Sequence, residues 1–229
     1  MEIVANTVPM IACNTVRSNF VSIASDYNVV AYVTEFARIS TSYALWHTYD
    51  PKIKAELFST ALAAGNGLAI IDPIALPPAH RADLESLGRV VRIVITNANH
   101  VRDAATFAHF YSAPIFAPPE LRGELPLSHK LQDGFAIGPL RVIRIEGAAD
   151  GEFALYHPDD GGTLIMGDAL INFDPHGFTL LPRKYCANQK QMIRSLRNLL
   201  DLDFSRIFFA HGNPIMIRAR ERLEALLNS

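Results

Sequence analysis

The stretch RVVRIVITNANHVRDAATFAHFY, residues 89–111, carries the clearest fold signal in the chain. Its first part, RVVRIVIT, is a continuous apolar run rich in β-branched residues, which is typical of a strand buried on both faces. Its last part, AATFAHFY, has apolar residues at helical spacing and follows Asp103, a residue type that caps helices. The polar string TNANHVRD at 96–103 therefore joins a strand end to a helix start, where open α/β sheets place their sites.

Three other apolar runs repeat this pattern of a buried strand with a polar end. They are GLAIIDP, which contains Asp72, GTLIMGDAL, which contains Asp168, and RIFFAHGNP, which contains His211. Because the strands deliver carboxylates and imidazoles at their C-terminal ends, we expect these groups to converge on one polar pocket. A metal site needs such convergence, since the ligands of one ion must surround it.

The remaining segments predict a second sheet and outer helices. SYALW and AELFSTAL predict a hairpin, PLRVIRIE and EFALYH predict two further strands, and the residues up to about Ile39 predict strands at a sheet edge. Helices are expected at HRADLESLG, after a cap at Asn188, and at RARERLEALL. Pro114 to Pro126 predicts a loop, and INFDPHGFTLLPRKYC predicts a long connection over one face. Two packed sheets with helices outside account for this order.

Composition sets the class of protein. The 229 residues are 49% hydrophobic and 19% charged, which predicts a single domain over residues 1–229, with residues 1–40 contributing N-terminal strands. A net charge of -2 without basic runs argues against nucleic acid or a membrane as partner and favours a small molecule. Only Cys13 and Cys186 are present, and the first residues lack the basic flank of a signal peptide. We therefore expect a cytoplasmic protein.

The landmarks IIDP, the polar string after Thr96, the late GD and the final HG resemble the metallo-β-lactamase superfamily in order and spacing. The resemblance covers the chain from about Tyr43 to the end. It implies an α/β (α+β) fold built as a four-layer αββα sandwich. It also implies a metal-dependent hydrolase whose metal ligands lie in the polar segments described above.

Most of the family's ligand positions hold other residues here. The family pattern after the strand is Thr-His-x-His-x-Asp-His, and its four ligand positions correspond to Asn97, Asn99, Val101 and Arg102. A third family histidine lies in the turn that EGAADGE resembles, where its position corresponds to Ala148. The family's bridging aspartate and last histidine correspond to the retained Asp168 and His211. An amide is a weak metal ligand and alanine or valine is none, so the pattern implies a degenerate metal site.

Two interpretations of this site remain open at the level of sequence. A one-residue shift places His100 at a ligand position, and His100, Asp168 and His211 would then bind one divalent ion (Zn, Mn or Fe) and act as the catalytic residues. Alternatively, the guanidinium of Arg102 repels a cation, pairs with Asp168 in a fork geometry and replaces the metal charge, so that no metal binds.

Further residues are candidates for contact with a substrate. The side-chain amides of Asn97 and Asn99, at the end of a strand, can also fix the loop by Asx-type hydrogen bonds. Asp72 corresponds to a family aspartate that supports the site without binding the metal. The resemblance implies substrate-binding residues in the long connection. The candidate substrate-binding residues are Asn97, Asn99, Arg102, Lys184, Tyr185 and Cys186.

Three functions are compatible with these features. The first is hydrolysis of a small ester, thioester or amide by a metal-activated water. The second is metal-free, non-catalytic binding of a small polar molecule, with Arg102 and Lys184 as anion contacts. The third is a scaffold for protein interaction, including a homodimer, which an exposed apolar stripe on the closing helix or on the N-terminal strands would favour.

Overall fold

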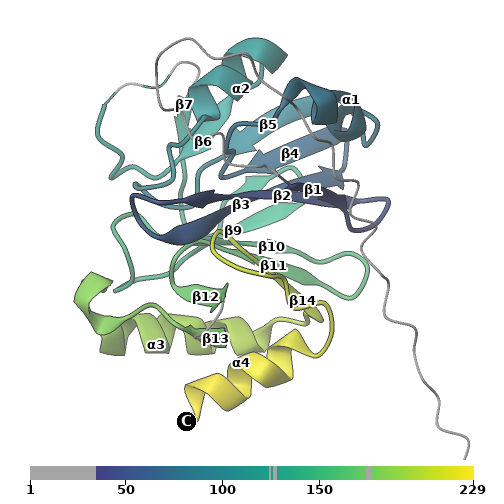
Figure 1. Cartoon of the computed structure of the whole chain (residues 1–229). Coiled ribbons are helices and arrows are strands. Elements are labelled where there is room, and N and C mark those ends of the chain that lie inside the picture. The colour runs from purple at the N-terminus through teal and green to yellow at the C-terminus, as the bar shows by residue number, and fades with distance from the viewer. Residues whose placement is uncertain (1–34, 124, 126–127, 174–176) are drawn as a thin grey trace, which may run out of the picture. The chain divides into compact units, whose positions relative to one another are not determined.

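The first of two β-sheets has seven strands in chain order, β1 to β7, and Figure 1 shows it in the upper half of the molecule. The computed structural model describes residues 35–123, 125, 128–173 and 177–229, so the strands predicted before Glu35 lie outside the described residues. Strands β1 to β4 are antiparallel, and β4 to β7 are parallel. The strands are β1 (Glu35–Arg38), β2 (Tyr43–Asp50), β3 (Ala55–Ala64), β4 (Gly67–Ile71), β5 (Val90–Val94), β6 (Ile115–Ala117) and β7 (Ser128–Lys130).

The second sheet has five strands in the order β14-β11-β10-β9-β8 and is antiparallel except for the parallel pair β11 and β14. A separate hairpin, β12–β13, follows β11. The bounds are β8 (Ala136–Ile137), β9 (Leu140–Arg144), β10 (Phe153–His157), β11 (Thr163–Met166), β12 (Leu170–Phe173), β13 (Gly177–Leu180) and β14 (Arg206–Phe209).

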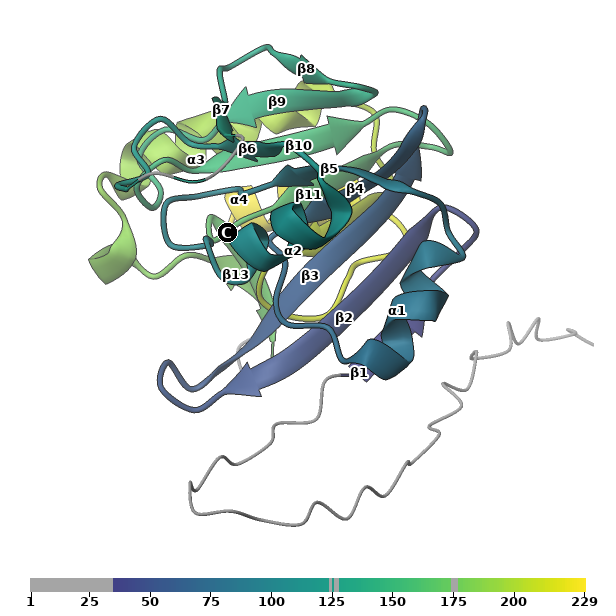
Figure 2. The same cartoon turned by 90° about the horizontal axis from the view of Figure 1, so that it is seen from above.

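Helices cover the outer face of each sheet. Figures 1 and 2 show α1 and α2 against the first sheet, and Figure 1 shows α3 and α4 against the second. The parallel pairs β4–β5, β5–β6 and β11–β14 require crossover connections, and α1, α2 and α3 lie in them, whereas α4 follows the last strand. The helices are α1 (Pro78–Glu85), α2 (Ala104–Tyr111), α3 (Gln189–Asn198) and α4 (Ala219–Leu227), with short 3-10 helices η1 (Arg183–Tyr185) and η2 (Leu199–Asp201).

Three apolar clusters correspond to the three interfaces between the four layers. Strand β4 shows why its sequence is continuously apolar: Leu68 and Ile70 pack towards α1 and α2, whereas Ala69 and Ile71 pack between the sheets. Successive side chains of a strand point to opposite faces, and here both faces are covered. The αββα sandwich is therefore confirmed. All the described residues belong to one compact unit, and the extension of a single domain to residue 1 stays a prediction.

Some local predictions were wrong. The segment from Pro114 to Pro126 contains strand β6, and residues 171–186 contain most of the β12–β13 hairpin, because pairing with a neighbouring strand orders short segments that carry little pattern of their own. Asp103 makes no side-chain cap to α2, and its main-chain N–H donates to the Pro73 carbonyl at 2.9 Å. Asn188 caps α3 as predicted, because its side chain accepts from the Gln191 N–H.

None of the helices in the described part of the chain is both long enough and apolar enough to cross a membrane.

The packing between the sheets predicts a large effect of truncating Phe208. This side chain is fully buried, and its ring lies 4.9 Å from that of Tyr43 in an edge-to-face pair across the two sheets. We expect Phe208→Ala to lower the free energy of unfolding by about 3–5 kcal/mol, measured by denaturant titration. Ile217→Ala, at a position that is 72% exposed, is the control and should change stability by less than about 0.5 kcal/mol. Equal effects of the two variants would contradict this packing.

Candidate active site

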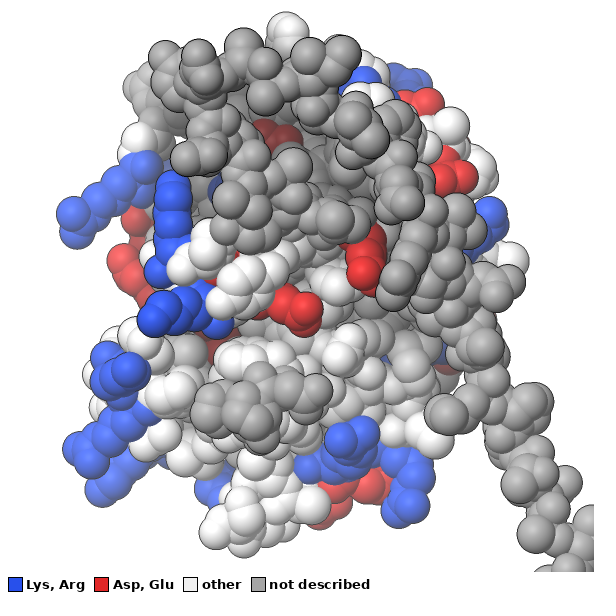
Figure 3. Space-filling model, viewed as in Figure 1, with Lys and Arg blue, Asp and Glu red and all other residues white. Residues whose placement is uncertain are grey.

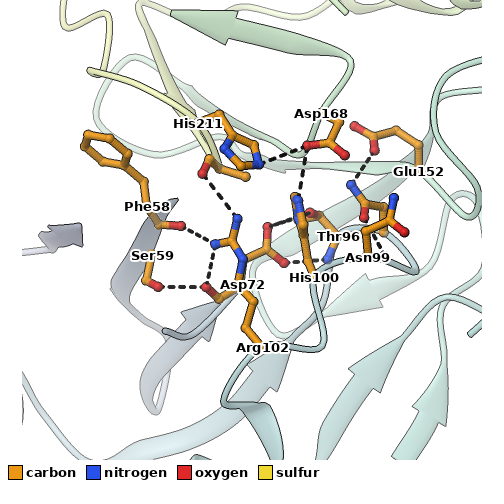
Figure 4. Close-up of polar contacts among 12 residues, drawn as sticks. Phe58, Ser59, Asp72, Thr96, Asn99, His100, Arg102, Glu152, Asp168 and His211 are labelled. Atoms are coloured by element: carbon orange, nitrogen blue, oxygen red, sulfur yellow. Dashed lines mark hydrogen bonds and ion pairs between the residues drawn. The ribbon is translucent and has the colours of Figure 1, made fainter. Parts of the chain in front are cut away.

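The polar residues at four strand ends meet at one edge of the sandwich. Asp72 follows β4, His100 lies in the loop after β5, Asp168 follows β11 and His211 follows β14. Figure 4 shows these side chains pointing toward one another. One ligand atom from each of His100, Asp168 and His211 lies within 4.8 Å of the others. The structure therefore brings together the three residues that the shifted register selects.

Asp168 is the centre of this group. Its Oδ1 atom lies 3.1 Å from Nε2 of His100 and 3.3 Å from Nε2 of His211. The side chains of Asp168 and His211 are 16% and 12% exposed, whereas that of His100 is 4% exposed. The group is therefore reached from solvent past Asp168 and His211, with His100 behind them.

The other ring nitrogens determine which tautomers the histidines adopt. Nδ1 of His211 lies 2.9 Å from the carbonyl oxygen of Glu56, which can only accept, so this nitrogen carries a proton. Nδ1 of His100 lies 2.9 Å from Oδ2 of Asp72. The hydroxyl of Thr96 already donates to the same Asp72 oxygen at 2.5 Å, so His100 donates from Nδ1 as well. Both Nε2 lone pairs then face a carboxylate oxygen, an arrangement that needs a positive charge between them.

A proton is one source of that charge. Burial and the neighbouring Arg102 oppose protonation of His100, but Asp168 and Asp72 outweigh them and raise the pKa of His100 to about 9. Burial also opposes ionisation of Asp168, yet the two histidines hold the pKa of Asp168 well below its usual range. In the absence of a metal, an imidazolium at His100 therefore lies between the two carboxylates, and its charge is attracted to both.

A divalent ion is the other source, and the residues present fit one. In a tetrahedral complex with bonds of 2.0–2.1 Å, ligand atoms lie about 3.3 Å apart. The two separations at Asp168, 3.1 and 3.3 Å, match this spacing. The outer nitrogens of His100 and His211 donate to a carboxylate and a carbonyl, which is the usual support for metal-binding imidazoles. The donor set thus suits one ion with a remaining open position.

Arg102 does not form the fork pairing with Asp168 that the sequence suggested. Its guanidinium donates to the main-chain carbonyls of Phe58 at 2.6 Å, Asp72 at 3.0 Å and Ala210 at 3.3 Å. These carbonyls belong to β3 and to the segments that follow β4 and β14. Arg102 thus links strand β3 to the segments that follow β4 and β14, and its charge is held by these main-chain carbonyls. Burial lowers the pKa of Arg102, whereas the nearby carboxylates of Asp72 and Asp168 favour its charged form.

Strained backbone accompanies this arrangement. Asp72 and Arg102 have φ angles of 49° and 41°, in the left-handed region that L-residues adopt at a cost. The surrounding hydrogen bonds hold both residues there, and such strain is typical of functional sites.

Asn97 and Asn99 play different parts in the loop after β5. Asn97 is fully buried, so its side chain is not available to a substrate. Its Nδ2 donates to Glu152 at 2.9 Å, and its Oδ1 accepts from the Asn99 N–H at 2.9 Å, which is the Asx-type contact expected from the sequence. Asn99 lines the cavity beside the site, where a substrate can reach it.

Glu152 is a buried carboxyl of this site that the sequence did not reveal. It accepts from the Ala169 N–H at 2.9 Å and from Asn97, and burial together with the charge of Asp168 raises its pKa to about 8. Glu152 comes from the turn in which the resemblance assigned a ligand position to Ala148, and Ala148 itself is buried in the apolar core. The signal available in the sequence was an acidic residue directly before the apolar run of β10.

Gly167 makes room for these contacts. A Cβ atom at this position would lie 2.8 Å from both the Glu152 Oε1 and the Thr96 Oγ1 atoms. A side chain here would therefore push apart the carboxyl and the hydroxyl that support Asp168 and Asp72. The Gly-Asp pair in the sequence thus has a steric reason as well as a chemical one.

A cavity of about 1400 Å³ opens beside Asp168 and His211. Lys184 and Tyr185 line it, as expected for residues of the long connection. Cys186 does not line it. Its thiol lies against the Leu181 carbonyl at 3.4 Å, and burial raises the pKa of that thiol, so Cys186 is a packing residue and not a ready nucleophile.

The buried carboxyl of Glu152 predicts a pH-dependent stability of the metal-free protein. Because its pKa is raised from 4.5 to about 8, its contribution is complete below pH 4.5 and is lost as the pH rises through 8. We expect the melting temperature in the presence of a chelator to fall between pH 5 and pH 8, and to fall less in Glu152→Gln. Glu224→Gln, at an exposed position of α4, should follow the wild type. The same pH profile in all three proteins would refute this assignment.

Comparisons with known proteins agree with the fold. The family model described as the metallo-beta-lactamase superfamily matches residues 38–229. No curated protein gives a significant match. The solved metallo-beta-lactamase from Pontibacter korlensis is 15% identical with a TM-score of 0.67, and the alignment covers 86% of this chain and 100% of that one.

Two further structures show the same fold. A metallo-beta-lactamase family protein from Thermus thermophilus is 22% identical with a TM-score of 0.59, over 83% of this chain and 80% of that one. A protein described as TTHA1623 in a di-iron-bound form is 22% identical with a TM-score of 0.57, over 75% of this chain and 93% of that one. The last of these proteins holds iron, as its description states, and membership of the family supports a metal-dependent hydrolase as the class of function. With a family match over residues 38–229, the chain belongs to the metallo-beta-lactamase superfamily.

Proposed function

We propose that this protein is a hydrolase that works with one divalent metal ion, held by His100, Asp168 and His211. The observation that carries the proposal is the convergence of two imidazole Nε2 atoms on one carboxylate oxygen, at 3.1 and 3.3 Å. Hydrogen bonds to Asp72 and to the Glu56 carbonyl orient the two rings so that their lone pairs face that oxygen. This is the orientation that metal binding requires.

The chemistry follows from the position of these residues. A bound divalent ion supplies a Lewis acid, which lowers the pKa of water and polarises a carbonyl oxygen. Asp168 and His211 are the partly exposed members of the group and line the cavity, so they are the residues that an ester, thioester or amide carbonyl approaches. Asp72 keeps His100 in one tautomer by accepting a hydrogen bond from its Nδ1, and the Thr96 hydroxyl donates to the same oxygen of Asp72.

A single ion agrees better with this chain than a pair of ions. The positions that the family pattern assigns to further ligands hold Asn97, Val101 and Arg102, and the amide of Asn97 is engaged with Glu152. The guanidinium of Arg102 is a fixed cation held by three carbonyls. It supplies positive charge to Asp72 and Asp168, so less metal charge is needed to balance these carboxylates.

Elemental analysis tests the proposal directly. After dialysis against zinc or manganese and removal of excess ion, the purified tag-free protein should contain about one ion per chain. His211→Ala and Asp168→Asn should each reduce that content at least tenfold, because each removes one of three ligands. His109→Ala, at an exposed position of α2, is the matched control and should bind as the wild type does.

A content near zero in the wild type would overturn the metal-dependent function. It would favour the second candidate, a metal-free binding protein, for which the observation is the high pKa of His100. In that case a proton occupies the place between His100 and Asp168 below a pH of about 9.

Competition between the proton and the metal predicts how affinity changes with pH. The ion requires neutral His100, and below its pKa of about 9 the neutral fraction grows tenfold for each unit by which the pH rises. We therefore expect zinc affinity, measured by competition with a chelating dye, to rise about tenfold per pH unit between pH 6 and pH 8 after correction for the dye. An affinity that stays constant over this range would show that His100 is not a ligand.

A further inference from the structure

The cavity beside the candidate metal site is larger than a small ester requires. Its volume of about 1400 Å³ exceeds the roughly 300–1,000 Å³ of most small-molecule sites. Its walls come from the β2–β3 turn, the β12–β13 hairpin, η1, the start of α3 and the end of α4. Figure 1 shows the β2–β3 turn and the start of α3 on the same side of the sandwich. The space therefore extends well beyond Asp168 and His211.

Much of the wall is aliphatic. The apolar side chains come from β12, β13, α3 and α4, and they are buried or half-buried although they face the cavity. They include Ile171, Leu180, Leu181, Ile193 and Leu226. Because such a wall offers few hydrogen-bond partners, it favours a flexible hydrocarbon chain over a polar sugar or peptide.

Three lysines complete the wall with positive charge. Lys52 and Lys54 come from the β2–β3 turn and Lys184 from η1, and all three are exposed. Among the described residues, none of them has a carboxylate within 4.0 Å. Figure 3 shows Lys and Arg side chains gathered along the left edge, the side on which the β2–β3 turn lies in Figure 1.

The acidic side chains of the cavity do not cancel this charge. Asp150 and Asp168 are the acidic residues of its described lining. Asp168 already faces two histidines, and its charge is matched within the site. Against the three lysines, the exposed carboxylate of Asp150 is the only acidic side chain of the described lining outside the site, so a net positive charge faces whatever enters the cavity.

We propose that the cavity binds an amphipathic anion: an aliphatic chain that packs on the apolar wall and bears a carboxylate or phosphate that the lysines attract. This inference rests on the proposed function, since it names the substrate class of the same site. An acyl ester, thioester or amide of this kind places its anionic group among Lys52, Lys54 and Lys184 and its reactive carbonyl near Asp168 and His211. Charge complementarity and apolar burial select the same class of molecule.

Binding to the metal-free protein tests the inference separately from catalysis. By titration calorimetry with chelator present and below the micellar concentration, decanoate should bind about tenfold more tightly than decanol at low ionic strength. The difference should shrink in 0.5 M salt, because screening weakens exposed charge pairs. Hexanoate should bind more weakly than decanoate, by about fourfold for each methylene removed.

Variants identify the residues responsible. The triple variant Lys52→Gln, Lys54→Gln, Lys184→Gln should lose the preference for decanoate over decanol, whereas Lys130→Gln, at an exposed position of β7 outside the cavity, should retain it. Ile193→Trp should weaken decanoate binding at least tenfold, because the larger side chain would occupy the space beside the apolar wall. Ile217→Trp, at an exposed position outside the cavity, should not weaken it. Melting temperatures within a few degrees of the wild type verify that each variant is folded.

The outcomes separate the two proposals. Equal affinity for decanoate and decanol, or no binding of either, would overturn the amphipathic anion. Loss of binding in Lys130→Gln or Ile217→Trp equal to that in the cavity variants would place the ligand elsewhere and overturn it too. Decanoate binding with the expected variant pattern in a protein that takes up no metal would sustain the inference while the metal-dependent function fails.

Discussion

The site depends on one electrostatic constraint: a carboxylate oxygen of Asp168 faces the ring nitrogens of His100 and His211 in a largely buried setting. The outer nitrogens of both rings already donate to Asp72 and to the Glu56 carbonyl, so the inner nitrogens turn their lone pairs toward the acid. Two lone pairs and a negative charge at these distances repel one another unless a cation lies between them. A proton on His100 relieves the contact between His100 and Asp168, whereas a divalent ion would relieve the contacts of both histidines with Asp168.

The surrounding residues keep this charge balance inside the protein. Arg102 places a fixed positive charge among the carbonyls of Phe58 in β3 and of Asp72 and Ala210 after β4 and β14, where it favours the ionised forms of Asp72 and Asp168 without pairing with Asp168. Glu152 resists ionisation, first because it is buried and second because the carboxylate of Asp168 repels its negative charge. The pKa values of these residues and the affinity of the site for a metal ion are therefore coupled, so a change in the charge of one residue shifts the pKa values of the others.

The sandwich links this charge balance to a large cavity. Asp168 and His211 lie just beyond the C-terminal ends of two parallel strands, and the cavity beside them is bounded by segments that lie outside the centre of either main sheet: the β2–β3 turn, the β12–β13 hairpin and η1. The strands fix the position of the reactive groups, and the turns and helix ends that surround them set what can bind. This division allows one fold to keep its core while its ligand changes.

The sequence by itself determined the αββα architecture and the strand ends where Asp72, Asp168 and His211 lie, because apolar runs with polar ends depend only on which faces of a strand are covered. The tertiary structure decided the partners. It brought His100 to Asp168, directed the guanidinium of Arg102 to main-chain carbonyls and buried Asn97. It also turned the half-buried thiol of Cys186 toward the Leu181 carbonyl, and it supplied Glu152 from the turn in which the family pattern had assigned a ligand position to Ala148. These contacts join residues between 5 and 108 positions apart, and no local pattern encodes which of several polar groups a folded loop will turn inward.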